Sequence, residues 1–167
     1  MKLLGAGLIW TSLIYAGAVY SIKLKGRIEL LDKTALMIRE MKIQLEYLNM
    51  PVYDILKEVK SKAYLSDLVF LENCSDMIKN GSDFPTAWKI SIENTSLCYK
   101  RNEKDRLLHL GMNLGASNTE SQLSILDMHS LYFDEFLSKA KAKKQKQGNL
   151  SVALAALLGC MIFILII

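Results

Sequence analysis

Thiol and imidazole side chains are the groups in this chain most able to do chemistry, and there are few of them. Cys74, Cys98 and Cys160 form no CxxC pair, and their odd number supplies no disulfide framework. His109 and His129 are too few and too far apart to complete a zinc site with these thiols. We therefore expect free thiols in a reducing compartment, surface or partly packed histidines, and no metal or other cofactor.

Motifs for catalysis and for nucleic-acid binding are also missing from the sequence. No segment of the form G-x-x-x-x-G-K-[ST] occurs, so ATP hydrolysis in any process that the chain serves belongs to a partner. The lysine run at 139–146 contains no aromatic residue on which a base would stack. The sequence predicts a non-enzymatic protein with no nucleic-acid partner and no small-molecule substrate.

Charge is unevenly distributed over the 167 residues, which have room for one domain. Residues 3–22 and 147–167 contain no charged side chain, and each stretch is long enough to cross a bilayer as a helix. Basic residues flank both stretches on the side of the central region. They are Lys23, Lys25, Arg27, Lys139, Lys141, Lys143, Lys144 and Lys146.

This pattern favours a two-pass integral membrane protein with transmembrane helices at 1–22 and 147–167. Positive flanks stay on the inner side, so residues 23–146 are expected in the cytoplasm, with the lysine run against an anionic leaflet. The alternative is a signal peptide cleaved after Ala18, which places the domain outside the cell. It leaves the lysine run on the outer side, against the charge rule.

Between these stretches, apolar residues recur at helical spacing. The expected helices cover 28–48, 51–59, 66–79, 83–94, 103–114 and a sixth from 118 that continues through the lysine run. Ser66, Asp83 and Asn118 are the expected caps, while Gly81 and Gly115 are expected to end helices. The sequence predicts an all-α fold, a six-helix bundle flanked by N- and C-terminal transmembrane helices.

Three residues of the bundle have expected structural roles. Trp88 is a core anchor, because a single Trp on an amphipathic helix buries most apolar area inside its own domain. Gly111 allows a close helix crossing, and Gly115 supplies a left-handed C-cap.

The last helix has an expected apolar stripe and acidic flanks. The stripe consists of Leu123, Leu126, Ser130, Phe133 and Leu137. The flanking acids are Asp127, Asp134 and Glu135. They form either a solvated face or a patch that docks a basic partner surface.

Several motifs together resemble the stage III sporulation protein AB family. They are the opening at residues 1–6, the helix end at 44–47 followed by Pro51, and Leu-Gly-x-x-Leu-Gly-x-Ser-Asn at 110–118. The family positions are Pro51, Gly81, Trp88, Gly111, Leu114, Gly115, Ser117 and Gln122. The resemblance covers essentially the whole chain. Asn118 stands where the family more often has Asp, and both residue types cap helices well.

The resemblance implies a membrane component of the channel between mother cell and forespore, on the mother-cell side. It also implies a helical domain similar to that of the platform protein of type II secretion and type IV pilus systems. Such a domain contacts a secretion-type ATPase and other membrane subunits, with Asp127, Asp134 and Glu135 as candidate docking acids. The alternative is a membrane-tethered adaptor or regulatory bundle unrelated to secretion.

Overall fold

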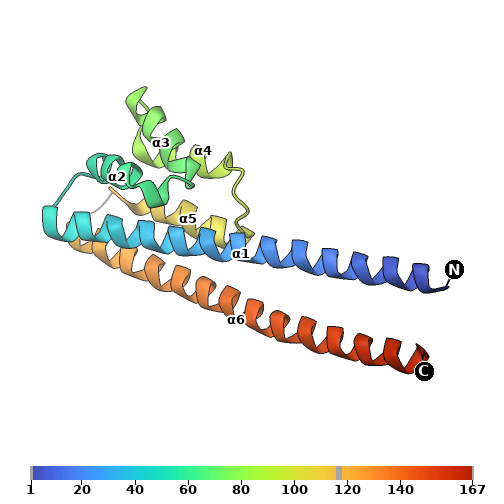
Figure 1. Cartoon of the computed structure of the whole chain (residues 1–167). Coiled ribbons are helices and arrows are strands. Elements are labelled where there is room, and N and C mark those ends of the chain that lie inside the picture. Colours follow the sequence, from blue (N-terminus) through green and yellow to red (C-terminus); the bar gives the residue numbers. More distant parts are fainter. Residues whose placement is uncertain (1, 116–117, 167) are drawn as a thin grey trace. The chain divides into compact units, whose positions relative to one another are not determined.

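The computed structural model describes residues 2–115 and 118–166, with backbone only for the helical residues 2–18, 20–21 and 148–166. These residues form six α-helices, one 3₁₀ helix and no strand (Figure 1). The bounds are α1 Lys2–Leu48, α2 Val52–Ser61, η1 Ala63–Leu65, α3 Val69–Lys79, α4 Phe84–Glu93, α5 Arg101–Asn113 and α6 Thr119–Ile166. The predicted all-α class and the six helices are confirmed.

The chain divides into two compact units. One unit is Glu29–Leu137, and the other combines Met1–Ile28 with Ser138–Ile167. The first unit holds the second part of α1, all of α2 to α5 and the first part of α6. The features that follow lie in Glu29–Leu137 unless another range is given.

The predicted localisation as a two-pass integral membrane protein is contradicted. In the part of the chain whose residues are fully described, no helix has a stretch long and apolar enough to cross a membrane. The physical reason is charge, since α1 carries Lys23, Lys25 and Arg27 in quick succession and α6 carries the lysine run. The charge-free stretches themselves, and the leader-cleavage alternative at Ala18, lie almost wholly outside the described side chains.

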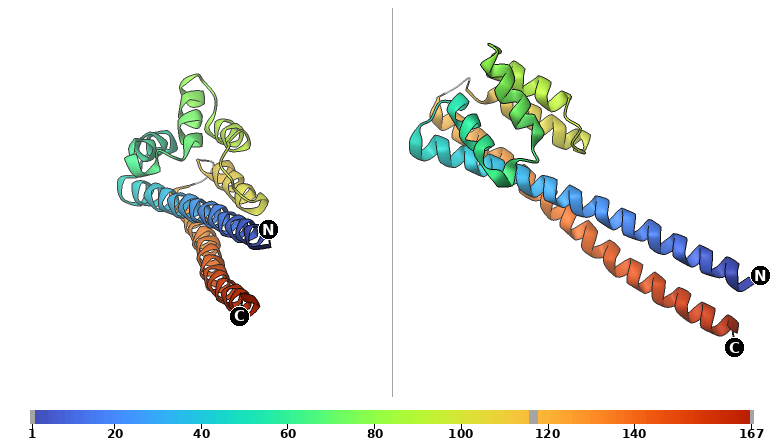
Figure 2. Two further views of the ribbon diagram at one scale, coloured as in Figure 1. Left: turned by 45° about the vertical axis from the view of Figure 1, so that its right-hand side comes forward. Right: turned by 45° about the horizontal axis from the view of Figure 1, so that its top comes forward.

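Helices α1 and α6 lie side by side and run in opposite directions within residues 29–137 (Figures 1 and 2). Arg39 Nη2 lies 2.6 Å from Asp134 Oδ1, and Lys42 Nζ lies 2.7 Å from Asp127 Oδ1. The hydrogen bond to Asp127 raises the pKa of Lys42. Exposed pairs of this kind add little stability each, but they fix which faces of the two helices meet.

The apolar stripe of α1 packs into the core as predicted, apart from its end. Five of its six residues are buried: Leu31, Ala35, Ile38, Met41 and Leu45. Leu48, the last residue of the helix, is 59% exposed instead. The recurrence at three and four residues explains the burial, because it aligns these side chains on one helix face.

A partly buried hydrogen bond ties the segment before α5 to α1. The Thr34 hydroxyl donates to the Leu30 carbonyl at 2.8 Å, so the Tyr99 hydroxyl is the donor in its 2.7 Å bond to Thr34 Oγ1. Burial raises the pKa of Tyr99. The phenol therefore stays protonated and keeps donating over the physiological pH range.

Helix ends follow the predicted caps at two of three positions. Asp83 Oδ2 accepts from Thr86 N at 3.0 Å, and Asn118 Oδ1 accepts from Ser121 N at 3.1 Å. Ser66 is not a cap: α3 begins at Val69, after Leu68 in the cap position, and Ser66 N donates to the 3₁₀ turn at Ala63. The prediction for Ser66 was wrong because this extra turn occupies the chain before α3.

Two further helix boundaries depend on backbone conformation and on a side-chain cap. Gly81 and Gly115 have φ of +94° and +84°, as expected for glycines that end helices. Helix α5 begins two residues earlier than predicted, at Arg101, because the Glu103 carboxylate accepts from Lys100 N at 2.8 Å.

Helices α4 and α5 cross closely at Gly111 and Trp88. Trp88 is fully buried, and its indole N–H donates to the Leu107 carbonyl at 2.7 Å. A Cβ at position 111 would lie 2.0 Å from Trp88 Cδ1, so only glycine fits against the ring. Both predictions, the core anchor and the close crossing, are confirmed.

Candidate docking site

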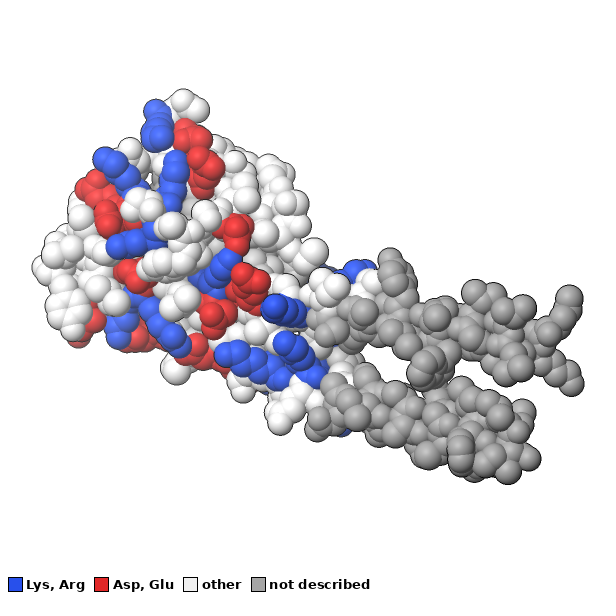
Figure 3. Space-filling model, viewed as in Figure 1, with Lys and Arg blue, Asp and Glu red and all other residues white. Residues whose placement is uncertain are grey.

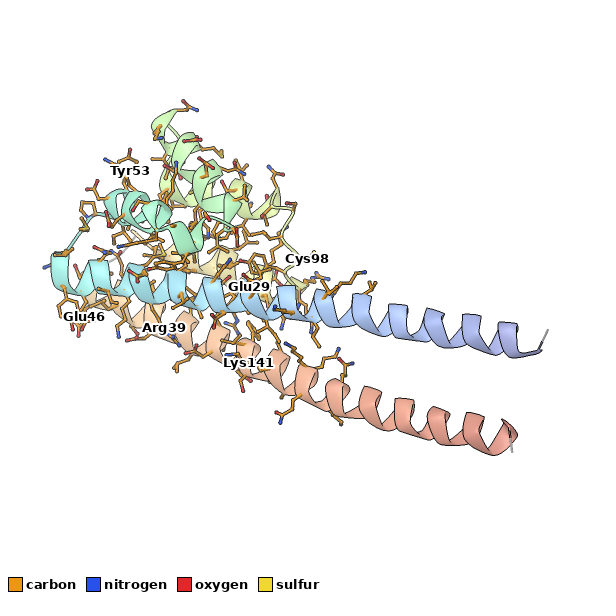
Figure 4. The ribbon with its side chains drawn as sticks, in the orientation of Figure 1. Glu29, Arg39, Glu46, Tyr53, Cys98 and Lys141 are labelled. Atoms are coloured by element: carbon orange, nitrogen blue, oxygen red, sulfur yellow. The ribbon has the colours of Figure 1, made fainter. Side chains whose placement is uncertain are left out.

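The thiols that the structure describes are not arranged for catalysis or metal binding. Cys74 is buried, and burial raises its pKa to about 12. Cys98 is exposed in the segment between α4 and α5 (Figure 4), while Cys160 lies outside the described side chains. Within the described residues, no group of three or more His, Cys, Asp or Glu side chains is close enough to hold a metal ion.

His129 is buried, whereas the sequence predicted a surface or partly packed histidine. It is 1% exposed and lies on the buried face of α6 with Leu126 and Phe133, whereas the predicted stripe ran through Ser130. Its Nδ1 atom has no hydrogen-bond partner among the described residues. Burial, followed by the charges of Arg106 and His109, lowers the pKa of His129 to about 4. The imidazole is therefore neutral at physiological pH, and His109 itself is exposed.

Arg106 covers the ring beside this histidine. Its guanidinium carbon lies 3.8 Å from the centroid of the Tyr132 ring, and that ring lies 6.2 Å from His129. The contact is a cation–π interaction, which ties α5 to α6 and keeps a fixed positive charge near the imidazole.

A pocket of about 550 Å³ lies where three turns of the 29–137 unit meet. We call it the turn pocket. It is lined by Leu45, Asn49, Met50, Pro51, Val52, Phe84, Pro85, Leu114, Gly115, Thr119 and Gln122. These residues come from the turn between α1 and α2, the start of α4, and the turn between α5 and α6. None of them carries a charge, and several are exposed, so the pocket is open to solvent.

Backbone conformation brings these turns together. Asn49 has a φ of +46°, and Pro51 follows at the N-cap of α2, which makes the turn after α1 short and sharp. Gly115 N donates to Gln122 Oε1 at 3.3 Å, which closes the turn before α6. A Cβ at Gly115 would lie 3.4 Å from Val52 Cγ2, so the two turns are in contact.

The family positions singled out from the sequence fall into two neighbouring groups. Pro51, Leu114, Gly115 and Gln122 line the turn pocket. Trp88 and Gly111 form the crossing of α4 and α5, and Gly81 ends α3 just before α4 begins. Ser117 lies outside the described residues. The motif residues that the structure describes therefore shape this end of the unit and supply no thiol, imidazole, amine or carboxylate.

Several exposed apolar side chains are close in sequence to residues that line the turn pocket. Ten large hydrophobic residues are exposed among the described residues, and half lie within two positions of a lining residue. We call these five the apolar rim: Ile43, Tyr47, Leu48, Tyr53 and Met112. Tyr47 is 74% exposed, and Tyr53 projects from α2 at the same end (Figure 4). Exposed apolar groups that form one patch mark interaction sites, and Tyr47, Leu48 and Tyr53 flank the turn between α1 and α2 that lines the pocket.

The charged residues within two positions of a lining residue are all acidic. They are Glu46, Asp54, Asp83 and Glu120, which we call the acidic margin. Elsewhere on the face shown in Figure 3, basic and acidic side chains alternate over the 29–137 unit. Glu46 of this margin also attracts Lys42, the base that pairs with Asp127.

Two of the three acids predicted for docking lie on a different surface, the α1-facing side of α6. Asp127 and Asp134 form ion pairs with Lys42 and Arg39 of α1, and Glu135 is exposed on the same helix. The basic residues at the flanks lie in the unit made of 1–28 and 138–167. All are exposed except Arg27, which is half-buried: Lys23, Lys25, Arg27, Lys139, Lys141, Lys143, Lys144 and Lys146.

Comparison with known proteins gives two matches. The family model described as stage III sporulation protein AB matches residues 2–167. A solved structure titled stage III sporulation protein AB (SpoIIIAB) superposes with a TM-score of 0.59 at 19% identity, covering 71% of this chain and 94% of that one. At this identity the structural match shows a shared fold. No curated protein matches the sequence.

Proposed function

Because the chain belongs to the stage III sporulation protein AB family, we propose that it serves endospore formation as a non-enzymatic docking platform for a secretion-type ATPase. A role in sporulation follows from the family. The platform role and the ATPase partner are our proposal, and they draw on the likeness of this family to secretion platforms.

One observation supports the proposal most strongly. Four of the family positions, Pro51, Leu114, Gly115 and Gln122, line an open and uncharged pocket. That pocket has an apolar rim and an acidic margin, which are properties of a protein interface.

The chemistry of the pocket also favours binding over catalysis. Its lining contains no cysteine, histidine, lysine or carboxylate, and its one hydroxyl, that of Thr119, has no general base among the lining residues to activate it. The buried His129 is on another part of α6 and is not among the lining residues. In this proposal the energy from ATP hydrolysis is supplied by the partner, and this chain holds that partner in place.

The test is binding of the full chain to a secretion-type ATPase from the same spore-forming cell. We expect the two proteins to co-elute and to give a saturable isotherm in calorimetry, with no ATP hydrolysis by this chain alone. A chain that is folded by circular dichroism and still fails to bind the ATPase at concentrations of about 100 μM would contradict the platform role.

A second arm addresses the acids on α6. The paired variant Asp127→Asn with Asp134→Asn removes the two carboxylates that face Lys42 and Arg39. If α6 is the docking surface, ATPase affinity falls in this variant. If docking uses the turn pocket, affinity is unchanged, since the variant leaves every lining residue intact.

A further inference from the structure

We infer that the turn pocket binds a short segment of the partner in which apolar side chains are flanked by lysine or arginine. This inference rests on the proposed function, because it specifies the chemistry by which the platform recognises its ATPase. The occupant is thus a basic and apolar peptide segment of another protein.

The pocket has the size and lining for such a segment. Its volume of about 550 Å³ lies within the range of about 300–1,000 Å³ typical of ligand-binding clefts. Leu45, Val52, Phe84 and Leu114 give it apolar walls, while Gln122 and Asn49 place amide groups among them. Tyr47, Leu48 and Tyr53 of the apolar rim adjoin lining residues in sequence at the turn between α1 and α2, which suits a segment longer than one side chain.

The acidic margin sets the charge of the partner. Glu46, Asp54 and Glu120 form no ion pair within the described residues, and a hydrogen bond from Thr86 N lowers the pKa of Asp83. A positively charged segment gains favourable encounter and orientation at such a margin.

The helix ends around the pocket also contribute partial charges, and acidic residues are common near helix N-termini. The pocket meets the N-termini of α2, α4 and α6 and the C-termini of α1 and α5. Each helix end carries about half an elementary charge. The three N-termini thus offset only about one and a half of the four negative charges, and the two C-termini restore about one. The four carboxylates and five helix ends together keep a formal charge of about −3 to −4, to which Lys42, which attracts Glu46, adds one positive charge.

Several other carboxylates of the unit are already paired with bases. The carboxylates of Asp127 and Asp134 are occupied by bases of α1, and Glu72 and Asp76 lie near Lys60. A basic segment there would have to displace an existing ion pair. At the acidic margin it meets carboxylates that are free of such pairs.

The first experiment uses a short fluorescein-labelled peptide with a Leu-Phe-Leu centre and two lysines on each side. Binding to the full chain is followed by fluorescence anisotropy at low and at physiological salt. We expect saturable binding that weakens at least about threefold as salt is raised. A peptide with glutamates in place of the lysines, and one with Gly-Ser-Gly at the centre, should not bind. Equal affinity for the lysine and glutamate peptides would overturn the inference.

Two variants locate the binding. Thr119→Trp puts a large ring at an exposed lining position directly after the Asn118 cap, and it should abolish peptide binding. The triple variant of Glu46→Gln, Asp54→Asn and Glu120→Gln spares the Asp83 cap and should weaken binding about tenfold at low salt. Because the triple variant adds no bulk, it keeps the inference testable if Thr119→Trp fails to fold.

The matched control removes three carboxylates far from the pocket in sequence. It combines Asp32→Asn, Glu93→Gln and Asp105→Asn, all at exposed positions, and changes the net charge by the same amount. We expect less than a twofold change in affinity. A loss equal to that of the margin variant would show that only net charge matters, and it would overturn the assignment to the pocket.

The outcomes separate this inference from the platform role. If the ATPase binds and the two pocket variants leave its affinity unchanged, the pocket inference is wrong and the platform role stands. If the peptide binds at the pocket and the ATPase does not bind, the ATPase assignment is wrong and the chemistry of the pocket stands. If light scattering shows a dimer that Thr119→Trp dissociates, the occupant is a second copy of this chain, and the inferred partner is wrong.

Discussion

Replacing Gly111 by alanine tests the packing of α4 on α5 most directly. The new Cβ would lie 2.0 Å from Cδ1, 2.3 Å from Cγ and 2.4 Å from Nε1 of Trp88. Because ordinary carbon contacts are about 3.5–4.0 Å, the indole must move by about 1.5 Å. Phe70 and Phe84 each have ring centroids 5.5 Å from Trp88, so the ring has little room to move.

Three effects set the expected change in the free energy of unfolding. Overpacking of a well-filled core costs about 3 kcal/mol at the upper end of its usual range. Displacement of the indole also weakens its hydrogen bond to Leu107, a loss of about 1 kcal/mol. Alanine then recovers about 1 kcal/mol through its higher helix propensity. We therefore expect Gly111→Ala to destabilise the protein by about 3 kcal/mol.

The assay is urea unfolding of the full chain followed by circular dichroism. Gly26→Ala is the matched control, because Gly26 lies within α1 with nothing within 4 Å of the new Cβ, and we expect no loss of stability. Adding Trp88→Leu to Gly111→Ala should make the two effects strongly non-additive, since the shorter side chain relieves the clash. A Gly111→Ala protein as stable as the unmodified chain would refute the reasoning.

Three further predictions concern buried polar groups. Lowering the pH from about 6.5 to 4 should reduce the free energy of unfolding by up to about 3 kcal/mol through His129. The reason is that the unfolded chain binds a proton in this range, whereas the buried imidazole, with its pKa of about 4, stays largely neutral. His129→Leu should abolish this part of the pH dependence in urea titrations. Tyr99→Phe should lower the free energy of unfolding by about 1 kcal/mol by removing the donor to Thr34, and an unchanged urea midpoint would contradict that bond. At pH 8 an aromatic disulfide reagent should label Cys98 within minutes and leave Cys74, with its pKa of about 12, unlabelled until the chain unfolds, as mapped by mass spectrometry of the peptides.

Local signals in the sequence were sufficient for most helix boundaries. The side chains of Asp83 and Asn118, and the positive φ of Gly81 and Gly115, act within a few residues, so the residue types alone identify them. Ser66 was misassigned because the 3₁₀ turn before α3 buries Leu65 and Leu68, and that choice depends on the rest of the core.

The burial of His129 and the turn pocket depend on packing between segments that are far apart in the sequence. After Leu126, both His129 and Ser130 satisfy helical spacing, at three and four residues, and only the packing of α6 selects the histidine. The turn pocket likewise was not predicted, since it depends on contacts between turns far apart in the chain. Four family positions, Pro51, Leu114, Gly115 and Gln122, belong to its lining. The motif does not indicate that they line one pocket together with Phe84.

The origin of the turn pocket in three separate stretches of chain has a consequence for synthesis and turnover. The pocket is complete only when 45–52, 84–85 and 114–122 have all been made and folded, so a nascent or truncated chain that ends before α6 lacks it. A partner that binds there selects the complete native unit and stabilises it by mass action. If a partner binds there, a chain damaged at any of the three turns is both less stable and unable to hold that partner.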